Sequence, residues 1–297
     1  MKLISYKKNE APALGLIIEQ HIAGLEEIIL RSALSGPLTM EEAIEWHEYR
    51  PDELQELEKW AHANRAALDM VPLESSSILP PIYPKRNIMC VGKNYAEHAV
   101  EMGSSADIPE YPIIFTKPPT SIVGMNEAVE ADEEVTQELD YEGEIAVIIG
   151  KKGKKIPENE ALNHVFGFTL LNDITARDIQ ARHKQFFLGK SMDTFCPLGP
   201  FVLLNKDWET FSPILRTYVN GELRQESSMN KMIFSVKDLI STLSAAMTLY
   251  PGDIIATGTP SGVGKGFKPP RFLKHGDEIT VSADELGKLT NKVTIHS

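Results

Sequence analysis

The stretch from residue 139 to residue 150, with the sequence LDYEGEIAVIIG, constrains this chain more than any other. Its apolar, β-branched second half is typical of a buried strand. Side chains alternate along a strand, so Glu142 and Glu144 point to one side, while Gly143 leaves the other side empty. Two neighbouring carboxylates stay ionised together only when a positive charge lies between them. The pattern therefore predicts a site for a hard divalent cation, Mg²⁺ or Mn²⁺.

A third metal ligand is expected at Asp173, which ends a second apolar run over residues 165–173. The glutamates also have a simpler interpretation, in which a surface strand shows its polar face to solvent. The other segments of the chain decide between these two interpretations.

The bulk composition excludes several classes of function. With 297 residues, 42% of them hydrophobic, the chain can form one large globular domain, or a large and a small one. The formal net charge of -12 repels phosphate backbones and argues against a nucleic-acid partner. Cys90 and Cys196 lack a CxxC spacing and are expected as free, buried thiols. Without a signal peptide or a run of ~20 apolar residues, we expect a cytoplasmic protein that does not enter membranes.

The chain is expected to divide near residue 80. Residues 1–80 predict a small N-terminal α/β domain, with helices that begin after Thr39 and at Pro51. A connector rich in serine and proline follows. Residues 81–297 read as short strands with a few helices, and they form the predicted catalytic domain. The fold class is therefore α+β, mainly β.

His98 and Glu101 are three residues apart on a predicted helix and so share a face. A carboxylate beside an imidazole orients the ring and selects its tautomer, as a catalytic dyad requires. The alternative is a solvated ion pair on a surface helix. The polar residues 104–112 that follow suit a mobile flap over a site.

Three later segments carry further polar candidates. Residues 173–175 are expected to cap a helix on which Arg177 and Gln180 face a carboxylate or keto oxygen. Lys190 lies among small residues and could supply a fixed positive charge. The glycine-rich loop after residue 257 is not a nucleotide-binding P-loop; its backbone N–H groups and Thr259 suit a small carboxylate.

Taken together, these segments resemble the fumarylacetoacetate hydrolase family from about residue 87 to the end of the sequence. The matching segments are VGKNY (91–95), LDYEGE (139–144), NDITARDIQ (172–180), GKS (189–191) and GTPSGVG (258–264). The resemblance implies a mixed β-sandwich roll as the catalytic domain and a homodimer. It also implies Mg²⁺ or Mn²⁺ at Glu142, Glu144 and Asp173. The substrate contacts that it implies are Arg177, Gln180, Thr259, Lys93 and Tyr95, beside the catalytic residues His98, Glu101 and Lys190.

The reactions of the family share an opening step, in which a small 2-oxo acid chelates the metal and forms an enolate. The pattern is most similar to bacterial members that act on oxaloacetate-like or acylpyruvic acids. We therefore expect metal-dependent cleavage of a C–C bond, first by oxaloacetate decarboxylation and next by acylpyruvate hydrolysis. Isomerisation or hydration of hydroxymuconate-type acids is one alternative. A binding protein that has kept the fold without turnover is another.

Overall fold

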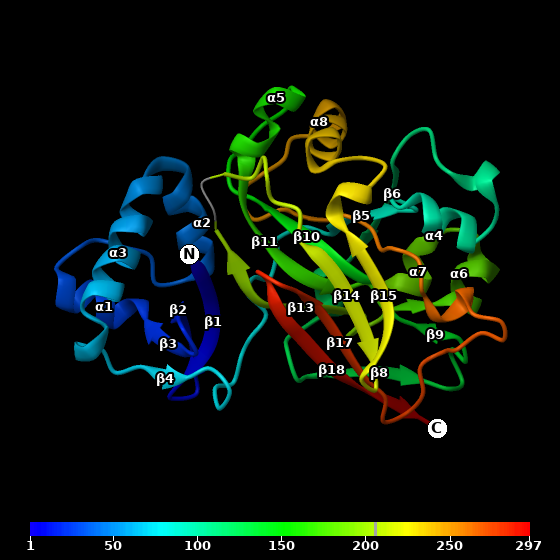
Figure 1. Cartoon of the computed structure of the whole chain (residues 1–297), viewed down its shortest axis with the longest axis horizontal. Helices are drawn as coiled ribbons and strands as arrows, with labels where there is room; N and C mark the ends of the chain where they lie inside the picture. Colours follow the sequence, from blue (N-terminus) through cyan, green and yellow to red (C-terminus); the bar gives the residue numbers. More distant parts are fainter. Residues whose placement is uncertain (205–206) are drawn as a thin grey trace.

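The predicted strand after Glu142 lies inside a large mixed sheet (Figure 1). The structure is a computed structural model that describes residues 1–204 and 207–297. Within these residues the large sheet has 11 strands, and β7 (Ile122–Val123) pairs beside β13. The other ten run, edge to edge, as β4 (Val71–Pro72), β3 (His21–Gly24), β2 (Ala11–Ile18), β1 (Lys2–Lys8), β13 (Cys196–Leu203), β11 (Val165–Asn172), β10 (Gly143–Ile149), β16 (Ile254–Ala256), β5 (Ile88–Gly92) and β6 (Ile113–Lys117).

A second sheet packs on the large one and makes the sandwich. Its five strands, in order within the described chain, are β15 (Glu222–Ser228), β14 (Ile214–Val219), β17 (Glu278–Ala283), β18 (Gly287–His296) and β8 (Ala128–Asp132). Strand β10 is buried on both faces, as its continuous apolar run predicts. Ile145 and Val147 join the core that contains Val281 of the second sheet. Ala146 and Ile148 face the opposite core, which includes residues of the N-terminal helices.

Helices cover the ends and the outer face of these sheets. They are α1 (Leu25–Ser32), α2 (Met40–Tyr49), α3 (Pro51–Ala63), α4 (Ala96–Glu101), α5 (Glu158–Ala161), α6 (Arg177–His183), α7 (Phe186–Lys190) and α8 (Val236–Ala246). Short 3-10 turns are η1 (Arg65–Ala67), η2 (Ser105–Asp107), η3 (Pro119–Ser121), η4 (Leu162–His164), η5 (Met229–Lys231) and η6 (Gly264–Gly266). Figure 1 shows α4, α6 and α7 gathered on the side away from the N-terminal segment. Among the described residues, no helix is both long and apolar enough to cross a membrane.

Local sequence signals predicted the starts of two helices correctly. Helix α2 begins after Thr39, whose hydroxyl accepts the backbone N–H of Glu42 at 3.1 Å, and α3 begins at Pro51. The predicted cap of the helix that carries Arg177 is wrong. Its N-cap is Ala176, which makes no side-chain cap, because Thr175 and Ala176 form strand β12 against β9 (Leu139–Asp140).

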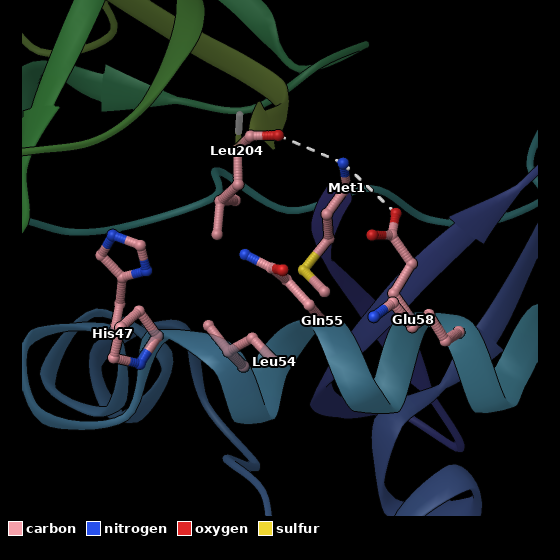
Figure 2. Close-up of a pocket in the computed structure, with 8 residues that line it drawn as sticks. Met1, His47, Leu54, Gln55, Glu58 and Leu204 are labelled. Atoms are coloured by element: carbon pink, nitrogen blue, oxygen red, sulfur yellow. Dashed lines mark hydrogen bonds and ion pairs between the residues drawn. The ribbon is translucent and has the colours of Figure 1, made fainter. Parts of the chain in front are cut away.

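The N-terminal segment continues the large sheet, because β1 pairs with β13 in the register Lys2 to Leu203. Figure 2 shows this junction, where the Met1 amine donates to the carbonyl of Leu204 at 3.1 Å and lies 3.2 Å from Glu58 Oε1. The cavity there, of about 260 Å³, is bordered by Gln55 and by none of the described residues predicted for the site. The domain division at residue 80 stays a prediction.

Both cysteines are free and buried, as expected. Burial is the main cause that raises the pKa of the Cys196 thiol to about 12, and it also raises the pKa of Cys90.

Candidate metal centre and active site

Three buried carboxylates meet at the end of β10. Oxygens of Glu142, Glu144 and Asp173 all lie within 4.8 Å of one another. Antiparallel pairing explains the arrangement, because Gly143 lies opposite Asn172 and the N–H of Asp173 donates to the carbonyl of Glu142 at 2.8 Å. The structure thus places the three predicted ligands together, and the interpretation as a solvated strand face does not hold.

Gly143 is required between the two glutamates. A Cβ atom at this position would lie 2.1 Å from Thr217 Oγ1 of the second sheet. The close approach of strand β14 therefore keeps Glu142 and Glu144 on the cavity side of the sandwich.

Two lysines hold two of these carboxylates, Glu142 and Asp173. The Lys190 ammonium donates to Glu142 Oε2 at 2.8 Å, to Asp173 Oδ2 at 2.6 Å and to Thr175 Oγ1 at 2.9 Å. All three of its donors are therefore used by the protein. Lys117, fully buried, donates to Asp173 Oδ1 at 2.7 Å and to the carbonyl of Lys190.

Arg177 adds a third cation from the start of α6. Its Nε donates to Asp140 Oδ2 at 2.8 Å, and its Nη1 lies 2.7 Å from Glu142 Oε1. Nη2 is buried and has no hydrogen-bond partner among the described residues. An unsatisfied guanidinium donor at a cavity wall is a binding group for a ligand oxygen.

The two glutamates respond to burial in opposite ways. Burial opposes ionisation of Glu142, but Lys190 and Arg177 overcome this effect and hold its pKa well below the usual range. For Glu144, burial and the charges of Asp173 and Glu142 raise the pKa instead. The cations of the protein therefore offset the charge of Glu142 and Asp173 but not that of Glu144.

A divalent cation bound here would offset the buried charge of Glu144. Every donor atom in the cluster is a carboxylate oxygen, which suits Mg²⁺ or Mn²⁺. Each oxygen that accepts a hydrogen bond keeps a further lone pair for a metal. The residues fit the predicted cofactor.

The predicted dyad lies beside this cluster. His98 Nδ1 is 3.2 Å from Glu101 Oε2, and the histidine is 5% exposed, so the pair is not a solvated surface pair. Glu101 is fixed in turn by the N–H of Gly262, which donates to its Oε1 at 2.8 Å. His98, Glu142, Arg177 and Lys190 all border one cavity of about 270 Å³.

The remaining predicted contacts differ in their placement. Lys93, Gln180 and Thr259 border the same cavity. The Thr259 hydroxyl donates to the carbonyl of Gly143 at 2.9 Å, so its proton is already used. Tyr95 is 3% exposed, pairs through its backbone with Met232, and is not among the described residues that line the cavity.

Four backbone N–H groups of the glycine-rich loop bind carboxylates of the protein itself, so these four are not free for a ligand; the role of Thr259 stays a prediction. The N–H of Gly258 donates to Glu144 Oε2 at 2.8 Å. The N–H groups of Gly264 and Lys265 donate to the two oxygens of Asp140 at 2.7 and 3.0 Å. Because the N–H of Gly262 also donates to Glu101, the backbone of this loop holds three acids: Glu144, Glu101 and Asp140.

The sequence did not identify Lys117 or Asp140 as site residues. Lys117 meets its partner 56 positions away, and Asp140 meets Arg177 across 37 positions. The sequence offered two weak signals for them. Lys117 ends an apolar strand, and Asp140 precedes Glu142 by two residues.

The Gly258→Ala variant should unfold at a lower temperature than the wild type. Gly258 has φ +100°, and a Cβ there would lie 2.7 Å from the Cβ of Asn94 and 3.0 Å from the carbonyl oxygen of Val91. Strain and overlap together should cost about 2 to 4 kcal/mol of folding free energy. Thermal melting measures the loss.

Gly276→Ala is the matched control, because Gly276 has φ +85° with nothing within 4 Å of the added Cβ. It should show the strain alone, about 1 kcal/mol. Equal losses in both variants would contradict the close packing of the loop on Asn94.

Comparison with known proteins agrees with this architecture. The family model described as fumarylacetoacetate (FAA) hydrolase C-terminal matches residues 87–294. The chain is 54% identical over 244 residues to oxaloacetate tautomerase YisK of Bacillus subtilis, which covers 80% of this chain and 81% of that protein.

Solved structures show the same fold over the whole chain. A fumarylacetoacetate hydrolase from Exiguobacterium antarcticum is 37% identical, with a TM-score of 0.84 and 100% of both chains covered. A 5-carboxymethyl-2-hydroxymuconate delta-isomerase from Mycobacterium smegmatis is 29% identical, with a TM-score of 0.75 and the same coverage. These likenesses confirm the predicted fold class. The chain belongs to the fumarylacetoacetate hydrolase family.

Proposed function

We propose that this enzyme interconverts the enol and keto forms of a small 2-oxo dicarboxylic acid of the oxaloacetate class. The observation that carries the proposal is the shared cavity, in which His98 lies with Glu142, Arg177 and Lys190. Moving a proton between C3 and the C2 oxygen requires a base beside a wall that stabilises negative charge. The name of the Bacillus subtilis relative, an oxaloacetate tautomerase, supports the same reaction.

The dyad supplies the proton transfer. When Nδ1 of His98 donates to Glu101, Nε2 is the unprotonated nitrogen and can take a proton from C3 of the keto acid. The ring then gives this proton to the C2 oxygen, which completes the enol. In the reverse direction the same nitrogen takes the enol proton and delivers it to C3. Glu101, held by Gly262, keeps the ring in this tautomer.

The anionic end of the substrate is bound on the opposite wall. The unpartnered Nη2 of Arg177 is available to a carboxylate or keto oxygen. When bound by Glu142, Glu144 and Asp173, Mg²⁺ or Mn²⁺ supplies Lewis-acid stabilisation of the charge that grows on the C2 oxygen. Lys190 holds two of these ligands in place rather than donating to substrate.

Decarboxylation of oxaloacetate, the reaction that the sequence placed first, becomes the second candidate. It needs the same stabilised enolate but no base at C3, and the buried Lys190 and Arg177 favour such an anion. The homodimer implied by the family resemblance stays a prediction that light scattering can test.

A direct assay separates the candidates. Purified protein with Mn²⁺ is added to enol-oxaloacetate, and the ultraviolet absorbance of the enol and the release of pyruvate are followed together. We expect metal-dependent loss of the enol that is faster than pyruvate release and stops with a chelator. Acetylpyruvate and 5-carboxymethyl-2-hydroxymuconate test the hydrolase and isomerase alternatives. Enol loss no faster than in buffer would refute the proposal.

A further inference from the structure

The cavity beside the metal centre is strongly cationic for a chain whose formal net charge is -12. Among the residues that the structure describes, six charged side chains line it, and of these only Glu142 is negative. The positive ones are Lys93, Arg177, Lys184, Lys190 and Lys265. A cleft of one sign concentrates ligands of the opposite sign, and this one suits an anion with more than one negative charge.

Most of these cations already have strong partners within the protein. Lys190 uses all its donors on the cluster, and Lys93 lies 3.2 Å from Asp107. Lys265 is different, because its ammonium is 4.0 Å from its nearest acid, Glu138, and its side chain is 37% exposed. It is therefore available to an anion in the cavity.

The backbone fixes Lys265 next to Arg177. The N–H of Lys265 donates to Asp140 Oδ2 at 3.0 Å, and the same oxygen accepts from Arg177 Nε at 2.8 Å. Lys184 lacks this link, because it follows the last residue of α6, seven positions after Arg177. In a four-carbon diacid, three bonds of about 1.5 Å separate the two carboxyl carbons. So short an acid favours a cation beside Arg177, which is where the backbone places Lys265.

We infer that Lys265 binds the distal carboxylate of a 2-oxo dicarboxylic acid whose 2-oxo end lies at the carboxylate cluster. This inference rests on the proposed function and assigns the residue that selects dicarboxylic over monocarboxylic acids. Ion pairing with a partly exposed lysine should change affinity by about tenfold. Lys265 acts on binding and takes no part in the proton transfer at His98.

Isothermal calorimetry with the Mn²⁺-loaded protein tests this assignment without turnover. L-malate and L-lactate are the probes. Both are 2-hydroxy acids, but only malate has a second, distal carboxylate. The wild type should bind malate more tightly than lactate. Lys265→Gln should weaken malate binding about tenfold and leave lactate unchanged, whereas Lys265→Arg should restore most of the preference.

Lys288→Gln is the matched control, because Lys288 is an exposed residue of strand β18 that does not line the cavity, and it should change neither affinity. Thermal melting equal to that of the wild type shows that each variant is folded. The assignment is wrong if the wild type binds malate no more tightly than lactate, or if Lys265→Gln weakens both probes equally. It is also wrong if Lys184→Gln, and not Lys265→Gln, removes the preference. Failure of the enol assay with a normal malate preference would reject the reaction and keep the binding site.

Discussion

Glu144→Ala should abolish measurable Mn²⁺ binding and, with it, turnover. Without Glu144 the remaining ligands, Glu142 and Asp173, are already offset by Lys190, Lys117 and Arg177. The variant therefore lacks the carboxylate whose charge the protein's own cations do not offset. Loss of a direct ligand should exceed the 10- to 100-fold loss of affinity that is typical of an outer-shell partner, so we expect more than about a hundredfold. Calorimetric titration with Mn²⁺ measures it.

Glu144→Gln separates metal binding from folding. Its amide oxygen can still accept the N–H of Gly258, which lies 2.8 Å from Glu144 Oε2 in the wild type. Because burial and neighbouring charge raise the pKa of Glu144, the folded metal-free protein favours a neutral group there.

The sign of the pH effect follows from this raised pKa. Above the ordinary glutamate value of 4.5, an unfolded chain loses the proton that the folded chain retains. The metal-free wild type should therefore lose stability relative to Glu144→Gln as the pH rises, measured by thermal melting. Mn²⁺ should raise the melting temperature of the wild type only. Unchanged Mn²⁺ affinity in both Glu144 variants would reject the metal centre.

His98→Asn should lower enol–keto turnover by about 10²-fold or more, because it removes the base that moves the proton at C3. His98 is not a member of the carboxylate cluster, so Mn²⁺ affinity should stay within about twofold of the wild-type value, inside the scatter of such titrations. Pyruvate release from oxaloacetate should fall less than tautomerisation, since loss of CO₂ needs no base at C3. The coupled enol and pyruvate assay reads both reactions at once.

His183→Asn is the matched control, because His183 ends helix α6 and is exposed. It should turn over enol-oxaloacetate at the wild-type rate. A His98→Asn enzyme with full tautomerase activity would mean that the pair with Glu101 only stabilises helix α4.

The meeting of the three carboxylates could be predicted because it depends on local rules. Alternation along β10 places Glu142 with Glu144, and the antiparallel neighbour β11 brings Asp173 to the same end. The sequence does not predict how the second sheet packs against β10. The contact with Thr217, which explains why residue 143 is a glycine, therefore appeared only in the structure.

The contact of a buried lysine with the carboxylate cluster could not be predicted from the sequence, for a physical reason. A buried lysine such as Lys117 is stable only when tertiary packing brings an acid and carbonyl oxygens to it. No short-range pattern encodes that meeting. The use of loop N–H groups on Glu144 and Asp140 was missed because a glycine-rich segment suits any nearby anion equally well.

The loop from Gly258 to Lys265 holds its three carboxylates through main-chain donors alone. A main-chain N–H survives every side-chain substitution except proline. Side chains on this loop, Lys265 among them, can therefore change during evolution while the acids that do the chemistry keep their positions. With Lys265 in its proposed role, substrate preference and reactivity would be separately mutable in one short segment.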